Sequence, residues 1–122
     1  MTTMASQDEL AQILSSLKVT GVKNVALTTV EGRTLSSTIA ESGPRFKLGA
    51  LSAASFAIAM KTGGELALGD LDQVQILCAD GALLLCPVGR KALLSAVADK
   101  RADPLALMRE MRRVALQLVA MV

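Results

Sequence analysis

The sequence predicts an α+β fold in which a mostly antiparallel sheet is covered by helices on both faces. Two turn dipeptides, Glu31-Gly32 and Asp80-Gly81, each lie between segments of strand-like composition, and such turns join antiparallel strands. Helical patterns precede, separate and follow these hairpins. The expected order is helix, strand, strand, helix, strand, strand, strand, helix. We treat residues 1–122 as a single domain, because domains usually hold about 100 to 200 residues.

The first helix is expected over residues 6–17. Asp8 and Glu9 lie in its first turn, where negative charge suits the positive end of the helix dipole. Its leucine and isoleucine residues then recur at helical spacing on one side. Gly21 follows near the position where a helix commonly ends.

A hairpin of two strands is expected next. Residues 22–30 combine valine and leucine with threonine, a composition enriched in strands. Glu31-Gly32 then provides the turn into a second strand over residues 33–39.

The second helix is expected over the alanine-rich residues 45–61. A break at residues 42–44 precedes it, and Pro44 suits a position at or near the first helical turn. The pair Gly63-Gly64 is expected to stop this helix.

The third and fourth strands should form a second hairpin. Apolar and polar residues alternate over residues 71–79, and Asp80-Gly81 is a strong turn signal. Residues 82–88 are continuously apolar, which predicts a strand covered on both faces. Pro87 should lie near the end of that strand, because proline cannot donate to a sheet ladder.

A fifth strand is expected over residues 92–98, although its composition is equally compatible with a helix. Asp103 can cap the final helix, and Pro104 can occupy its first position. Apolar residues then follow a four-three spacing on one face nearly to the C-terminus. They are Leu107, Met111, Val114, Leu118 and Met121.

Composition excludes several classes of function. The net charge is only +2 and the chain has two phenylalanines, no tyrosine and no tryptophan, so it lacks the stacking platforms of single-strand nucleic-acid binders. It contains no histidine, which excludes every Ser-His or Cys-His mechanism. Neither the G-x-x-x-x-G-K-[ST] nor the G-x-G-x-x-G pattern is present. We therefore expect no catalytic residues, no bound cofactor and no nucleic-acid partner.

The two cysteines are not expected to bind metal or to form a disulfide. Two ligands cannot complete a zinc site, and the spacing from Cys78 to Cys86 is not that of a metal knuckle. With Asp80-Gly81 at the centre of the turn, Cys78 would face Leu83, far from Cys86. Both cysteines are therefore interpreted as small buried hydrophobes.

Targeting signals are also not evident. The N-terminus lacks the basic and apolar segments of a secretory signal. The longest apolar stretch, residues 50–60, is well short of the roughly 20 residues that cross a membrane. We expect a cytoplasmic protein that does not insert into membranes.

The second helix carries two apolar stripes, although a helix lying on a sheet needs only one. At about 100° per residue, one stripe is expected to cover the sheet; it contains Leu48, Leu51, Ser55 and Ile58. The other is the predicted homodimer interface and contains Gly49, Ala53, Phe56 and Met60. Its small residues would allow a second helix to approach closely, and its four-three spacing is the seam pattern of paired helices. The alternative is that the final segments of the same chain cover it.

The third strand is the second part of the predicted homodimer interface. Gln73 and Gln75 give it one polar stripe, which suits the edge of a sheet, and an open edge needs covering or pairing. Two copies paired edge to edge would form one continuous sheet. The equally weighted alternative is an ordinary edge strand protected by Asp70 and Asp72.

Several segments, in this order and spacing, resemble the roadblock/dynein light chain family in its short bacterial form. The resemblance covers nearly the whole chain, and no single motif within it is diagnostic. It rests on Leu14 and Leu17, Gly21-Val22, Glu31-Gly32, Leu48-Gly49-Ala50-Leu51-Ser52-Ala53, Leu83-Leu84-Leu85-Cys86-Pro87-Val88-Gly89, Ala92-Leu93-Leu94 and Leu107-Met108-Arg109 to Leu118.

The resemblance implies a five-stranded antiparallel sheet with one helix on one face and the N- and C-terminal helices on the other. It also implies that two copies join through the middle helix and the third strand into a ten-stranded sheet. Family members bind small Ras-like GTPases as regulators or scaffolds and are not enzymes, so we expect the same here. The alternatives are a small-molecule sensor domain and a heterodimeric adaptor subunit without GTPase regulation.

Overall fold

A five-stranded antiparallel sheet forms the middle layer of the protein in a computed structural model that describes residues 7–39 and 45–122. The helices are α1 (Gln7–Ser15), α2 (Arg45–Glu65) and α3 (Pro104–Leu118), which continues into the short 3-10 helix η1 (Val119–Met121). The strands are β1 (Val22–Thr29), β2 (Thr34–Ser37), β3 (Val74–Cys78), β4 (Gly81–Val88) and β5 (Ala92–Asp99). Their order in the sheet is β2-β1-β5-β4-β3. Both the predicted order of elements and the antiparallel sheet are confirmed.

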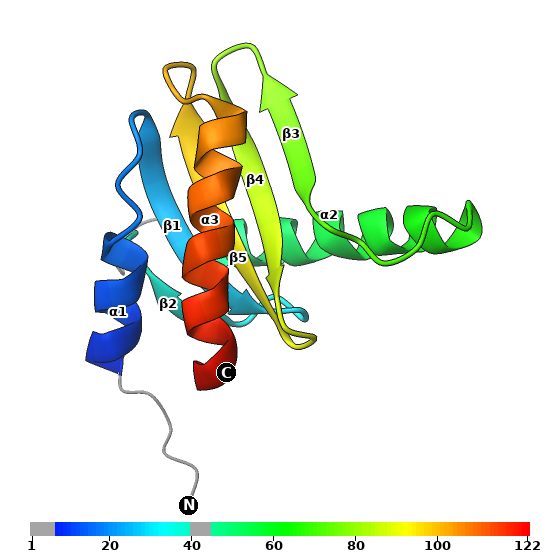
Figure 1. The fold of residues 1–122 in the computed structure, drawn as a ribbon, viewed down its shortest axis with the longest axis horizontal. Helices are drawn as coiled ribbons and strands as arrows, with labels where there is room; N and C mark the ends of the chain where they lie inside the picture. Colours follow the sequence, from blue (N-terminus) through cyan, green and yellow to red (C-terminus); the bar gives the residue numbers. More distant parts are fainter. Residues whose placement is uncertain (1–6, 40–44) are drawn as a thin grey trace, which may run out of the picture.

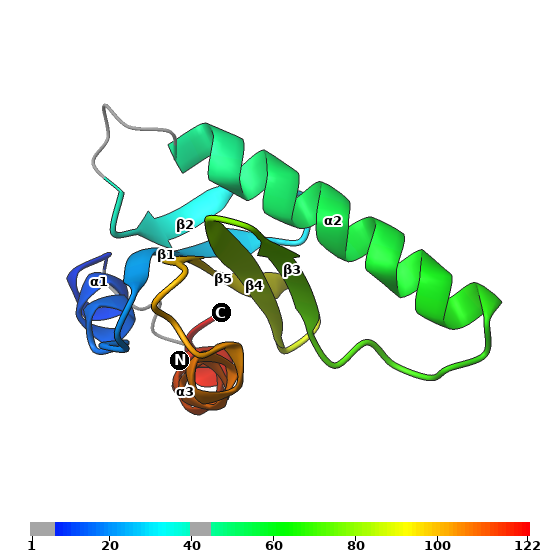
Figure 2. The same cartoon turned by 90° about the horizontal axis from the view of Figure 1, so that it is seen from above.

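The two faces of the sheet are covered unequally. Figure 1 shows α1 and α3 side by side on one face, and Figure 2 shows α2 alone on the other. The largest hydrophobic cluster lies between the sheet and the α1–α3 pair. On the opposite face α2 contributes to two small clusters, one around Leu48 and one around Phe56. The prediction that one helix covers one face of the sheet and the N- and C-terminal helices cover the other is therefore confirmed.

Helix α3 begins and packs as the sequence predicts. The Asp103 carboxylate accepts a hydrogen bond from the Leu105 amide at 3.0 Å, and Pro104 occupies the first turn. Of the predicted apolar stripe, Leu107, Met111, Val114 and Leu118 have no exposed surface. Burial of this stripe against the sheet fixes α3 on the largest core.

Two predicted boundaries fall outside the described residues. These are Ser6 at the start of the first helix and the break Ser42-Gly43-Pro44 before the second. Where α1 is described, it runs from Gln7 to Ser15 and buries Leu10 and Leu14.

The prediction that Gly63-Gly64 ends the second helix is wrong, because α2 continues to Glu65. It closes just beyond in a Schellman motif. The Ala67 amide donates to the Gly64 carbonyl at 3.1 Å and the Leu68 amide donates to the Gly63 carbonyl at 2.8 Å. Ala67 adopts a φ of 56°, a left-handed conformation that glycine usually occupies. The glycines therefore lie inside the last turn instead of after it.

This helix end predicts that exchanging glycine and alanine stabilises the protein. A Cβ added at Gly64 would meet no atom of the described residues within 4 Å, so Gly64→Ala should raise the free energy of unfolding by about 0.5–1 kcal/mol through better helix propensity. Ala67→Gly should also raise it, because left-handed geometry costs a residue with a side chain about 1–2 kcal/mol, partly offset by the flexibility of unfolded glycine. Urea denaturation measures both changes, and a lower midpoint for either variant would contradict this description of the helix end.

The β3–β4 hairpin turns one residue earlier than predicted. The turn residues are Ala79 and Asp80, and Gly81 already pairs with Cys78. On its other side Gly81 lies against β5, where an added Cβ would clash with the Ala98 carbonyl oxygen. Gly81 is therefore needed inside the ladder, not in the turn.

The environments of the two cysteines differ. Neither forms a disulfide; Cys86 is buried and Cys78 is exposed on β3. Burial raises the pKa of the Cys86 thiol above its ordinary value. The prediction that both are buried is thus confirmed for Cys86 and wrong for Cys78, because no element of the described ranges 7–39 and 45–122 buries β3 at that position.

Strand β4 is covered on both faces at its centre, as its continuous apolar run predicts. Leu84, Leu85 and Cys86 are consecutive and all are buried. Pro87 follows the last β3–β4 pair, Val74 with Leu85, so its missing amide hydrogen removes no bond from that ladder.

Candidate functional site

Large apolar side chains are exposed on α2, in the segment that follows it and on β3. We call this set the α2–β3 surface; it comprises Leu51, Ile58, Met60, Leu66, Leu68, Ile76 and Leu77. The second half of α2 runs past the edge strand β3, beyond the chain's own sheet (Figure 1). Exposed apolar patches of this kind commonly mark sites of protein interaction.

Helix α2 faces the sheet with the opposite side from the one predicted. Leu51 and Ile58, expected against the sheet, are 54% and 68% exposed, and Ser55 is only partly buried. Leu48 alone of that stripe is buried. The predicted assignment of this stripe to the sheet is therefore wrong except at Leu48.

The predicted interface stripe is divided by the structure. Gly49, Ala53 and Phe56 are buried within the chain itself, whereas Met60 is 52% exposed. Phe56 packs with the sheet residues Leu85 and Leu93. The alternative that the same chain covers this stripe is therefore correct for three of its four residues. They are covered by the sheet and its β1–β2 turn, whereas the alternative named the final segments of the chain.

Side-chain size explains which face of α2 lies on the sheet. A Cβ added at Gly49 would lie 2.7 Å from the Gly32 carbonyl oxygen in the β1–β2 turn, and one added at Gly32 would touch Ala53 at 3.4 Å. Beside this contact the buried Ser95 hydroxyl donates to the Ser52 hydroxyl at 3.0 Å. The small residues of α2 thus allow the close approach of the chain's own turn rather than of a second helix.

Strand β3 lies at the edge of the sheet, as predicted, and among the described residues it pairs only with β4. Its residues from Gln75 to Cys78 are exposed on both faces. Gln73 lies just before the strand and is half-buried, and its side-chain oxygen accepts a hydrogen bond from the Gln75 amide group at 2.7 Å. The outer side of β3 is therefore open to another strand, and the pairing of Gln73 and Gln75 with a second copy stays a prediction.

An ion pair joins the segment before β3 to α3. The Arg112 guanidinium donates a hydrogen bond to the Asp72 carboxylate, and this bond holds the pKa of Asp72 below its usual value. Both side chains are well exposed, so the pair should contribute little to stability. Asp72 thus contacts α3 rather than only protecting the edge strand.

Asp72→Asn is expected to remove a small, pH-dependent part of the stability. Because the pKa of Asp72 is lower in the folded chain, the ionised pair stabilises the fold above the unfolded pKa of about 3.9. That contribution disappears as the pH falls through the folded pKa. Urea midpoints of wild type should exceed those of Asp72→Asn near neutral pH and converge with them in strong acid. Arg112→Gln should behave in the same way, and a difference that does not change with pH would contradict this role.

Neither a metal centre nor a membrane helix is evident in the described residues. Over residues 7–39 and 45–122, no group of three or more acidic or cysteine side chains could hold a metal ion. No helix within those ranges is long and apolar enough to cross a membrane.

Known proteins with the same fold were found by comparison of both the sequence and the structure. The family model of the Roadblock/LC7 domain matches residues 9–98. A Roadblock/LC7 domain from Streptomyces avermitilis is 20% identical, with a TM-score of 0.83 over 88% of this chain and 92% of that one. The gliding protein MglB from Thermus thermophilus is 17% identical, with a TM-score of 0.84 over 99% and 93%.

An MglB structure with a tetrameric arrangement is also 17% identical, with a TM-score of 0.85 over 99% of this chain and 93% of that one. Among curated protein sequences, none matches this chain. At such identities the structural similarity establishes the fold, and the family match establishes the kind of domain.

Proposed function

The chain belongs to the Roadblock/LC7 domain family, and on this basis we propose that it is a homodimeric regulator or scaffold of a small Ras-like GTPase. Members of this family are generally not catalysts, and we propose that this chain likewise acts by binding. The observation that carries the proposal is the α2–β3 surface, which places exposed apolar side chains on the two elements through which the family is expected to dimerise.

The proposed dimer uses the outer face of α2. Leu51, Ala54 and Ile58 are exposed on that face at a three-four spacing, the seam pattern of paired helices. Figure 2 shows that the second half of α2 runs past β3. A second copy would cover this half and the exposed stripe. Of the interface residues predicted from sequence, Met60, Gln73 and Gln75 remain in the proposed interface. The buried Gly49, Ala53 and Phe56 instead lie on the side of α2 that packs against the chain's own sheet and β1–β2 turn.

The open edge of β3 supports the same arrangement. Two copies of an exposed edge strand can pair their backbone groups and extend one sheet through both subunits. Burial of Ile76 and Leu77 against the partner would accompany this pairing. The tetrameric arrangement of one MglB structure supports self-association in a protein with this fold.

A nucleotide-dependent pull-down tests the proposed function. The full-length protein is immobilised, and the small Ras-like GTPases encoded in the same genome are applied after loading with GDP or a non-hydrolysable GTP analogue. We expect one of them to be retained in one nucleotide state more than in the other, and GTPase rates measured with and without the protein separate a regulator from a scaffold. A homodimer that retains no such GTPase in either state would contradict the proposal.

Light scattering of the purified protein tests the dimer separately. A twofold mass at micromolar concentration is expected, whereas a monomer that dimerises only with a paralogous subunit would favour the heterodimeric adaptor. The single domain over residues 1–122 and the cytoplasmic location predicted from the sequence stay predictions within this proposal.

A further inference from the structure

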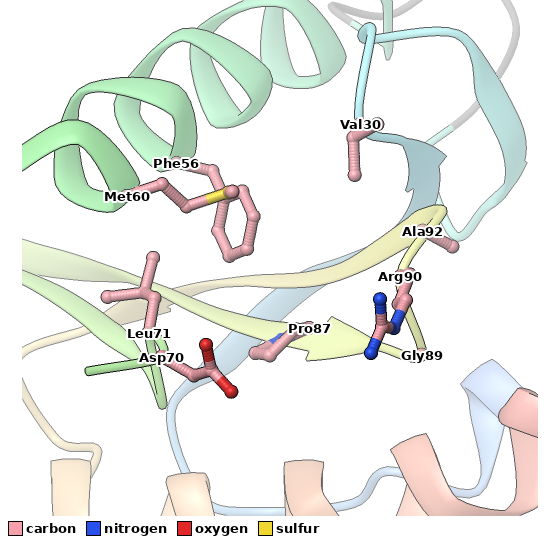
Figure 3. Close-up of a pocket in the computed structure, with 9 residues that line it drawn as sticks. All are labelled: Val30, Phe56, Met60, Asp70, Leu71, Pro87, Gly89, Arg90 and Ala92. Carbon is pink, nitrogen blue, oxygen red and sulfur yellow. The ribbon is translucent and has the colours of Figure 1, made fainter. Parts of the chain in front are cut away.

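A cavity of about 380 Å³ opens between α2, the segment before β3 and the β4–β5 turn. Figure 3 shows Phe56 and Met60 reaching into it from α2, with Leu71 and Pro87 on the opposite side. Its volume is at the lower end of the roughly 300–1,000 Å³ that ligand pockets occupy. A small ligand with an apolar body therefore fits it best.

The apolar wall of this cavity is held by the core. Phe56 is only 6% exposed and packs against the fully buried Leu85 and Leu93. The Val30 amide donates to the Lys91 carbonyl at 3.0 Å, which ties the β1–β2 turn to the β4–β5 turn beside the cavity. The cavity is therefore formed in the chain as folded, without needing a loop to close over it.

Two opposite charges lie at the opening. Figure 3 shows the Asp70 carboxylate and the Arg90 guanidinium directed into the cavity from different elements, with Pro87 between them. Within the described residues the two form no ion pair with each other. Each charge is thus available to a ligand placed between them.

This pair of charges restricts the chemistry of the ligand. A phosphate or another anion would be attracted by Arg90 but repelled by Asp70, and a simple cation would meet the reverse. A neutral apolar molecule would partly desolvate both charges without pairing either. A ligand that carries one positive and one negative charge on an apolar body can pair with both Asp70 and Arg90.

We propose that this cavity binds a free apolar α-amino acid as a zwitterion. Its carboxylate pairs with Arg90 and its ammonium group with Asp70, while its side chain lies against Phe56, Met60 and Leu71. The protein would then bind a small molecule in addition to the proposed GTPase partner. The proposal does not depend on that partner, and the site shares only Met60 with the α2–β3 surface.

Nuclear magnetic resonance titration of the full-length protein tests the site, with L-leucine, L-methionine and L-phenylalanine as probes at millimolar concentrations. Saturable shifts are expected for the backbone amides of Leu71, Arg90 and Ala92, which line the cavity. The matching N-acetyl amino acids lack the ammonium group and the amino-acid amides lack the carboxylate, so both should bind at least about tenfold more weakly.

Matched variants identify the charges responsible. Asp70→Asn and Arg90→Gln should each weaken binding at least about tenfold, whereas Asp80→Asn and Lys91→Gln, at exposed positions outside the cavity lining, should not. Light scattering on the same samples reports assembly independently of binding. The proposal is overturned if no probe gives saturable shifts or if the four variants bind alike. A peptide with an internal leucine, which has neither free charge at that residue, is tested as well. Binding of this peptide alone at these amides would also overturn the proposal.

Discussion

Leu51→Glu is expected to produce a folded monomer, whereas Ala53→Glu, two residues away on α2, is expected to prevent folding. Leu51 is 54% exposed in the single chain, so a carboxylate there stays in water until a second copy covers it. Burial of that unpaired charge in the dimer would cost several kcal/mol, which corresponds to a loss of more than about 100-fold in affinity. Light scattering measures the mass, and circular dichroism verifies the fold.

Ala53 has the opposite environment. It is 8% exposed and lies against Gly32, so glutamate there must displace the β1–β2 turn and bury a charge. Overpacking alone typically costs about 1–3 kcal/mol, and the buried carboxylate adds to it, against a total stability of only about 5–15 kcal/mol. We expect loss of the folded circular dichroism spectrum and aggregation.

Gln117→Glu is the matched control for both variants, because it adds the same charge to an exposed position on α3, across the sheet from α2. It should remain a folded dimer. A dimeric Leu51→Glu would contradict the interface on the outer face of α2. A folded, monomeric Ala53→Glu would instead restore the stripe first predicted from the sequence.

Gly49→Ala is expected to lower the free energy of unfolding by about 1–3 kcal/mol. Alanine normally favours a helix over glycine by roughly 1 kcal/mol, but here the new methyl group would lie 2.7 Å from the Gly32 carbonyl oxygen. Since that neighbour is backbone, the helix or the turn must move. Urea denaturation measures the loss.

Gly64→Ala is the control for that experiment, because it is the same substitution in the same helix with open space around it. The two variants should therefore shift the urea midpoint in opposite directions. An equal gain in stability for both would show that α2 does not press against the β1–β2 turn.

Local chemistry was sufficient to predict the order of elements. The Glu31-Gly32 turn, the Asp103-Pro104 helix start and the four-three stripe of α3 each depend on residues close together in sequence, and each is present in the structure. Boundaries were less predictable where a distant contact decided them. Gly81, for example, enters the ladder because it lies against Ala98, which the hairpin sequence alone does not reveal.

The face that α2 presents to the sheet could not be predicted from apolarity. Leucine and isoleucine lie on one side of this helix and phenylalanine on the other, so either side could have been buried. The decisive feature is the small size of Gly49 and Ala53 opposite Gly32, a contact between separate elements. The charges of the cavity, Asp70 and Arg90, likewise meet only through folding and belong to no sequence motif.

The hydroxyl pair between Ser52 and Ser95 has a consequence for how this kind of protein can diversify. The Ser52–Ser95 bond, the close approach to Gly32 and the buried Phe56 together place α2 on the sheet, so the exposed residues on its outward side contribute little to the position of the helix. Substitutions can therefore change the outward side of α2 while the rotation of the helix on the sheet stays the same. Paralogues could thereby acquire different binding preferences from one unchanged scaffold, with little penalty to folding.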